Sequence, residues 1–304
     1  MPISHPPVTV VMATYNGAAF LESQLVSIYN QNYPPAAVIV CDDGSADNTP
    51  LILKRYAQKY GLEYYINKTR LGVVQNFKKA VSLANASHYI ALADQDDIWL
   101  PDKLEKLTAA LIGIEDGETP ALAYSDLSIM DAGEKIIAPS FWQQWQFDRY
   151  PHTFQTLLFG NFITGCTVLM NPAMRQHFIQ MPVDVEMHDA WMALIGFGLG
   201  KTIAISQPLV LYRKHQNNVA YIKDYTKEKG LRKLISFARK IIKGDDYLND
   251  RMLIAAQFLQ QYQQQLPAQN LAILQTFLSY KNKPYLFRKL FFEKTFLNLP
   301  TPDS

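Results

Sequence analysis

Three carboxylates follow a short apolar stretch within the segment ALADQDDIWL. Asp94, Asp96 and Asp97 come directly after Tyr89–Ala93, which has the continuous apolar character of a buried strand. Like charges this close together repel, so a folded chain tolerates them mainly where a cation or several hydrogen-bond donors neutralise them. The pattern therefore predicts a metal-assisted site for a phosphorylated ligand. The alternative is a solvated loop in which Asp97 or Asp102 caps the following helix.

Polar side chains also follow two earlier apolar stretches, Val8–Ala13 and Val38–Cys41. They are Thr14, Tyr15 and Asn16 after the first stretch, and Asp42, Asp43, Gly44 and Ser45 after the second. Helical patterns alternate with these strands, so the sequence predicts an α/β fold with an open, mostly parallel sheet and helices on both faces. Such sheets bind ligands at the carboxyl ends of their strands. All three polar clusters lie at that end.

The composition limits the class of protein. With 304 residues and 48% apolar content, the chain can form one large domain, or one domain plus an appendage. It has no apolar run long enough to span a membrane and no recognisable secretory signal. Cys41 and Cys166 lie in apolar surroundings and are expected to be buried, reduced thiols. We therefore expect a cytoplasmic protein.

The charge is unevenly distributed, although the net charge is only +2. Residues 222–304 hold 14 Lys and Arg against 7 Asp and Glu, whereas residues 1–221 hold 15 against 20. Within this basic tail, Leu231–Ile242 has the pattern of a basic amphipathic helix, and Tyr285–Leu299 is basic and aromatic. Such helices either lie on an anionic membrane surface, here its inner face, or pack on the main domain or a second subunit.

Five segments together resemble the inverting glycosyltransferases of family 2, which have the Rossmann-like GT-A fold. They are VVMATYNG, VCDDGSADNT, LADQDDIW, MHDAW and LYRKHQNN, spread over roughly residues 8–219. The resemblance extends to bacterial enzymes that build cell-wall or capsular polysaccharide, rhamnosyltransferases included. It implies a catalytic domain at 1–221, with a nucleotide-sugar half at 1–126 and an acceptor half at 127–221. A helical tail at 222–304 follows.

The resemblance also implies a role for each matched residue. Asp189, in the MHDAW segment, would be the general base, although an aspartate there could also be a helix N-cap. Asp96 and His215 would hold Mg²⁺ or Mn²⁺, although His215 taken alone is more typical of a satisfied loop histidine. The donor-binding residues would be Thr14, Tyr15, Asn16, Asp42, Asp43, Asp94, Asp96 and Arg213.

The chemistry of sugar transfer requires these residue types. The leaving diphosphate must be neutralised by a divalent cation and a cationic side chain such as Arg213, and the acceptor hydroxyl needs a carboxylate base. The expected reaction moves one sugar from a UDP- or dTDP-sugar, with dTDP-rhamnose one candidate. The acceptor would be a hydroxyl of a cell-wall, capsular or exopolysaccharide glycan or its lipid-linked precursor. The Q-x-x-R-W element of processive members is absent, so we expect one sugar per encounter.

Other functions fit less well. An aspartyl-phosphate phosphatase carries its D-x-D motif after the first strand, whereas here the motif follows the fourth strand. A dinucleotide-dependent oxidoreductase would need G-x-G-x-x-G after the first strand, and that motif is absent here. The remaining alternative is a non-catalytic, membrane-docked partner protein with a degenerate nucleotide site. A homodimer is compatible with the sequence, and nucleic acid is not an expected partner.

Overall fold

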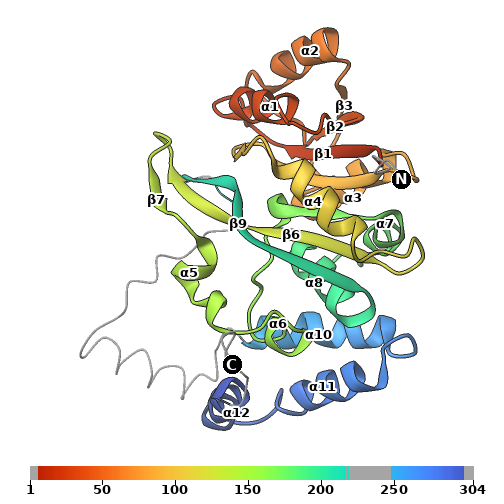
Figure 1. Ribbon diagram of the computed structural model, residues 1–304, viewed down its shortest axis with the longest axis vertical. Coiled ribbons are helices and arrows are strands. Elements are labelled where there is room, and N and C mark those ends of the chain that lie inside the picture. The colour runs from red at the N-terminus through yellow and green to blue at the C-terminus, as the bar shows by residue number, and fades with distance from the viewer. Residues whose placement is uncertain (1–5, 217, 219–247, 298–304) are drawn as a thin grey trace. The chain divides into compact units, whose positions relative to one another are not determined.

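The computed structural model describes residues 6–216, 218 and 248–297, and the chain divides into two compact units (Figure 1). The first unit comprises residues 1–145 and 163–213, and the second comprises 146–162 and 214–304. The basic stripe expected over Leu231–Ile242 lies outside the described residues and stays a prediction.

Four parallel strands form one half of the sheet in the first unit, in the order β3-β2-β1-β4. Almost every residue of β1, β2 and β4 is buried, which explains why these strands are continuous apolar runs in the sequence. The strands are β1 (Val8–Thr14), β2 (Ala37–Asp42), β3 (Glu63–Ile66) and β4 (Tyr89–Asp94). The connecting helices are α1 (Leu21–Tyr29), α2 (Thr49–Tyr60) and α3 (Val73–Leu83). The prediction of alternating strands and helices is confirmed.

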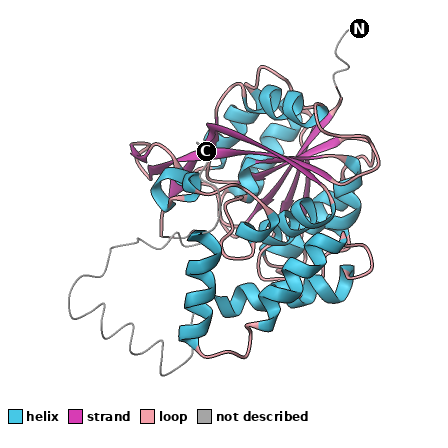
Figure 2. Ribbon diagram, turned by 60° about the horizontal axis from the view of Figure 1, so that its bottom comes forward, coloured by secondary structure: helices cyan, strands magenta, loops and turns pink. Residues whose placement is uncertain are grey.

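The other half of the sheet contains antiparallel pairs, which join β4 to β8, β8 to β6, and β9 to β5. The longest strand next to β8 is β6, which extends from Ala121 to Asp131. The strands of this half are β5 (Ile98–Trp99), β6 (Ala121–Asp131), β7 (Ile136–Ala138), β8 (Val168–Met170) and β9 (Lys201–Lys214). Figure 2 shows the strands fanning out in a twisted sheet. Since β4 lies between the two halves, Asp94 at its end lies where the strand direction changes.

Four further helices belong to the first unit. Asn171 caps α7 through its side chain, which accepts a hydrogen bond from the Met174 N–H, as the Asn-Pro pair indicates. Almost every residue of α8 is buried, with Trp191 fully so, and this firm packing holds the first turn of α8 in place. The helices are α4 (Lys103–Ile112), α5 (Phe141–Trp145), α7 (Pro172–Ile179) and α8 (His188–Leu199).

The second unit is helical. Its core includes Phe159, whose ring centroid lies 5.1 Å from that of Phe277 and 5.6 Å from that of Phe291. The helices are α6 (Phe154–Leu157), α10 (Leu248–Tyr262), α11 (Ala268–Ser279) and α12 (Tyr285–Leu297). None of the helices in the described part of the chain combines the length and the apolar character needed to cross a bilayer.

Candidate functional site

The loop between β4 and β5 presents the three acids at the carboxyl end of β4. Asp97 is fully buried, and its Oδ1 accepts a hydrogen bond from the Arg213 N–H at 3.1 Å. The other oxygen, Oδ2, is buried without a hydrogen-bond partner among the described residues. Asp102 occupies the N-cap position of α4 but makes no capping bond with its side chain. The alternative of a solvated capping loop is therefore wrong.

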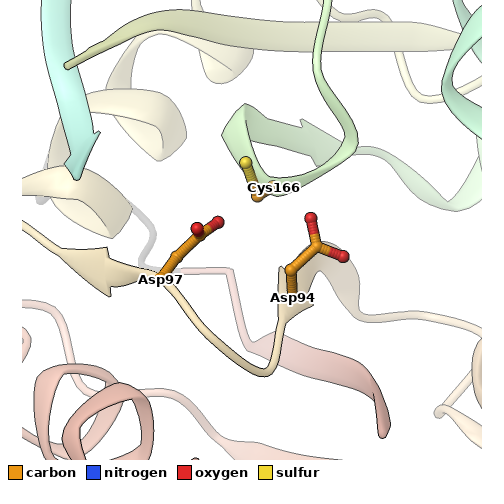
Figure 3. A group of neighbouring side chains, drawn as sticks. All are labelled: Asp94, Asp97 and Cys166. Carbon is orange, nitrogen blue, oxygen red and sulfur yellow. The ribbon is translucent and has the colours of Figure 1, made fainter. Parts of the chain in front are cut away.

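Asp94, Asp97 and Cys166 converge, with one oxygen or sulfur atom of each within 4.8 Å of the others (Figure 3). Burial and the neighbouring Asp96 and Asp189 raise the pKa of Asp94 to about 7, and burial also raises the pKa of Asp97 and of the Cys166 thiol. Carboxylate oxygens suit Mg²⁺ or Mn²⁺, whereas a protonated thiol does not, so the donor set for a hard cation is the acids alone.

A buried lysine, Lys103, lies next to these acids. The Lys103 Nζ donates a hydrogen bond to the Cys166 carbonyl oxygen at 2.7 Å and lies 3.1 Å from the ring centroid of Trp99. Burial lowers the pKa of Lys103 well below its usual value, and the charges of Asp97 and Asp94 oppose this effect. Sequence reasoning missed Lys103. The available signal was a lysine in the first turn of a helix whose inward side is otherwise made of three leucines and one threonine.

Arg213 holds the acid loop from the end of β9. Its Nε donates a hydrogen bond to the Asp96 carbonyl oxygen at 2.9 Å, and its Nη2 forms an ion pair with Glu134 at 3.0 Å. The guanidinium also lies 4.7 Å from the ring centroid of Phe20. These contacts position the loop that carries Asp96. The predicted contact between Arg213 and the donor diphosphate stays a prediction.

Asp42 and Asn16 join the loops that follow β1 and β2. The Asp42 carboxylate accepts hydrogen bonds from the Thr14 hydroxyl at 2.8 Å and from the Ser45 hydroxyl at 2.6 Å. The backbone N–H of Asn16 donates to the Ser45 hydroxyl, and the Asn16 side chain accepts from the Ala46 N–H at 2.9 Å. Asn16 has φ of 48°, a left-handed conformation that asparagine tolerates. Thr14, Asn16 and Asp42 thus shape these loops.

Asp43 is buried and holds the loop before α3. Its Oδ1 accepts from the Asn67 side chain and the Leu71 N–H at 2.9 and 2.7 Å, and its Oδ2 accepts from the Gly72 N–H at 2.8 Å. The carboxylate is therefore held in one orientation at the end of β2. The prediction that Asp43 contacts the nucleotide base remains to be tested.

Gln95, the middle residue of D-x-D, connects the acid loop to the loop after β1. Its Oε1 accepts from the Tyr15 N–H at 2.9 Å, and its Nε2 donates to the Tyr15 carbonyl oxygen at 3.1 Å. A Cβ on Gly17 would lie 2.0 Å from that Oε1, so only glycine leaves room for the Gln95 amide. Tyr15 is 38% exposed, with the Arg70 guanidinium 3.9 Å from its ring centroid. Sequence reasoning did not single out Gln95, Gly17 or Arg70.

We expect Gly17→Ala to displace the Gln95 amide and lower the free energy of unfolding by about 1–2 kcal/mol, since two exposed hydrogen bonds are lost. In a Gln95→Ala background, the same substitution should lower the free energy of unfolding much less, because the Gln95 amide that clashes with the new Cβ is absent. Urea unfolding of the four proteins of this double-mutant cycle measures the difference. Equal costs in both backgrounds would contradict the predicted clash.

Asp189 lies in the first turn of α8, largely buried, and its Oδ1 accepts a hydrogen bond from the Ala190 N–H at 2.6 Å. Its charge raises the pKa of Asp94, so the two acids share one electrostatic environment. The preceding His188 is a packing residue, with its ring centroid 4.4 Å from that of Phe77. The structure thus brings Asp189 toward the acid loop from a distant part of the sequence.

His215 belongs to the second unit, where its backbone N–H donates to the Asn218 side chain at 2.6 Å. Its proposed role as a metal ligand stays a prediction.

The raised pKa of Asp94 predicts how stability and metal affinity depend on pH. The folded chain keeps this proton up to about pH 7, whereas an ordinary aspartate releases it near 3.8. The free energy of unfolding of the metal-free protein should therefore fall as pH rises between these values. The affinity for Mn²⁺ at the neighbouring Asp96 should rise over the same range, because ionisation of Asp94 adds a negative charge beside the cation. Urea unfolding and Mn²⁺ titration across this range test both trends, and Asp94→Asn should flatten them.

Comparison with known proteins adds a family match. The model of the family described as "Glycosyl transferase family 2" matches residues 9–168. The dTDP-rhamnosyl transferase RfbG of Shigella flexneri is 25% identical over 271 residues, which cover 79% of this chain and 88% of that protein. The putative teichuronic acid biosynthesis glycosyltransferase TuaG of Bacillus subtilis is 26% identical over 224 residues, covering 71% and 82%.

A solved structure supports the fold. The mannosyltransferase PcManGT from Pyrobaculum calidifontis, in complex with GDP-Man and Mn²⁺, aligns with a TM-score of 0.56 at 19% identity. The alignment covers 97% of this chain and 80% of that protein. The predicted α/β fold with an open, mostly parallel sheet is thereby confirmed as a GT-A arrangement.

Proposed function

The chain belongs to glycosyl transferase family 2 and is a glycosyltransferase, and from this premise we propose that it transfers a single sugar from a nucleoside-diphosphate sugar to a glycan hydroxyl, with inversion at the anomeric carbon. The observation that carries the proposal is the acid loop at the end of β4, which Arg213 holds and which Asp189 approaches from α8. The name of RfbG, a dTDP-rhamnosyl transferase, favours a dTDP-sugar donor over the alternative of a UDP-sugar, and the name of TuaG, a putative teichuronic acid biosynthesis glycosyltransferase, favours a polysaccharide acceptor.

The donor site in this proposal is the edge formed by the loops after β1, β2 and β4. Tyr15 is partly exposed, with Arg70 over its ring, and this pair is the proposed contact for the nucleotide base. Asp43 and Asp94 accept hydrogen bonds from the base and the ribose or sugar. Thr14, Asn16 and Asp42 keep these loops in register through their own hydrogen bonds.

A divalent cation, Mg²⁺ or Mn²⁺, would bind the carboxylates of the acid loop and neutralise charge on the leaving diphosphate. We assign Asp96 as its main ligand, with His215 as the second candidate. The Mn²⁺ in the PcManGT complex is consistent with this assignment. Arg213 keeps the Asp96 backbone in place.

Asp189 is the proposed general base. In this mechanism its carboxylate takes the proton of the acceptor hydroxyl as the hydroxyl oxygen attacks the anomeric carbon, and the bond from that carbon to the diphosphate oxygen breaks. A single in-line displacement needs no second carboxylate as a covalent nucleophile. The configuration at the anomeric carbon is therefore inverted.

Thermal unfolding with UDP, dTDP, GDP and ADP, each with and without Mn²⁺, tests donor binding. A ligand at a hundred times its dissociation constant stabilises a protein by roughly 2.7 kcal/mol, which is a measurable shift. Stabilisation by one diphosphate only in the presence of Mn²⁺ supports the proposal and identifies the base. Incubation with the matching sugar nucleotides and a lipid-linked glycan then tests transfer. Diphosphate binding without any transfer or donor hydrolysis would favour a non-catalytic nucleotide-binding protein instead.

A further inference from the structure

One side of helix α12 is packed within the second unit, and another side carries exposed apolar residues. On the packed side, the Phe291 ring stacks on Tyr280 with 3.8 Å between centroids. Arg288 and Thr295 are buried on the same side, and Arg288 donates a hydrogen bond to the Asn249 side chain at 2.6 Å. These contacts determine which side of the helix faces outward.

The outward side carries three large apolar residues. Leu286, Phe287 and Leu290 are 46%, 60% and 61% exposed, and Leu290 follows Leu286 by one helical turn. Lys294 continues the same side one turn later and is exposed. A helix packed on a protein core normally presents polar residues to solvent on its other side. We call this surface, made of Leu286, Phe287, Leu290 and Lys294, the α12 outer face.

The surrounding charge is positive. Residues 281–297 hold five Lys and Arg and one Glu, and Lys281 and Lys283 are exposed directly before the helix. Residues 222–247 hold eight Lys and Arg and four Asp and Glu, so this segment also carries positive charge. Like charges disfavour the docking of that segment on the α12 outer face, and both regions would be attracted to an anionic surface.

We propose that the α12 outer face binds an anionic lipid bilayer. Its leucines and phenylalanine enter the boundary between headgroups and acyl chains, while the lysines contact the lipid phosphates. Such binding would bring the enzyme to lipid-linked acceptors. It requires neither donor nor metal, so vesicle binding and sugar transfer can succeed or fail separately.

Cosedimentation of the full chain with lipid vesicles tests the proposal. We expect binding to vesicles containing phosphatidylglycerol, little binding to pure phosphatidylcholine, and release at about 1 M salt, where the screening length is near 3 Å. The triple substitution Leu286→Ser, Phe287→Ser and Leu290→Ser should lower partitioning at least tenfold, an order-of-magnitude estimate from lost apolar burial. The matched control exchanges three exposed apolar residues of the first unit: Leu51→Ser, Ile137→Ser and Val183→Ser.

A cysteine label distinguishes other occupants of this face. Cys41 and Cys166 are buried, so an environment-sensitive maleimide dye on Leu290→Cys reports on this position. We expect rapid labelling without lipid and a blue shift on anionic vesicles. If the cysteine at position 290 is protected from the dye without lipid, the α12 outer face is covered by the chain itself or by a second copy. Sedimentation velocity distinguishes these two cases, because only the second produces a dimer. Either result would overturn the proposal, as would equal vesicle binding by the triple variant and the wild type.

Discussion

Asp189→Asn is expected to lower kcat by about 10²–10⁴-fold, the range for loss of a general base. Asparagine has nearly the same shape, and its carbonyl oxygen can still accept the hydrogen bond from the Ala190 N–H. The fold, and donor binding measured by thermal shift, should therefore be unchanged. Initial rates of transfer at saturating donor, together with the thermal shift of the same preparation, measure the effect.

The matched control is Glu186→Gln, which neutralises an exposed acid just before α8 and should keep wild-type kcat. If Asp189→Asn keeps wild-type kcat, Asp189 is only a helix-terminal residue and the base lies elsewhere. If it instead loses donor binding together with kcat, Asp189 contributes to the donor or metal site. The two readouts therefore separate the proposed base from both alternatives.

Asp96→Ala is expected to abolish the metal-dependent stabilisation by the nucleoside diphosphate, roughly 2.7 kcal/mol at a hundred times the dissociation constant. The Arg213 guanidinium bonds to the backbone oxygen of residue 96, so the substitution leaves that anchor intact. The loop should keep its position while one carboxylate ligand is lost. Thermal unfolding with diphosphate and Mn²⁺, compared with metal-free samples, measures the change.

Asp102→Ala is the control, because Asp102 lies near this loop in the sequence but forms only a partly exposed ion pair with Lys106. If Asp96→Ala keeps the full metal-dependent shift while Asp94→Asn or Asp97→Asn loses it, the cation belongs to the group formed by Asp94 and Asp97. That result would reassign the metal ligand without changing the proposed reaction.

Much of the first half of the sheet could be predicted from local pattern. Strands β1, β2 and β4 are buried on both faces, so each is a continuous apolar run that ends abruptly in polar residues. The antiparallel half could not be predicted in the same way. Strands β5, β7 and β8 have only two or three residues each, too few to show a period, and the partners of β5 and β8 lie far away in the sequence.

The sequence by itself determined the position of the acids, because parallel strands place their carboxyl ends at one edge and ligands bind there. Only the tertiary structure decided what surrounds them. The bond from Lys103 to the Cys166 carbonyl spans 63 residues, and the bond from Arg213 to the Asp96 carbonyl spans 117. Side-chain periodicity records which face of an element is buried, but not which distant element covers that face. Which charges and hydrogen bonds neutralise the acids is therefore a property of the folded chain.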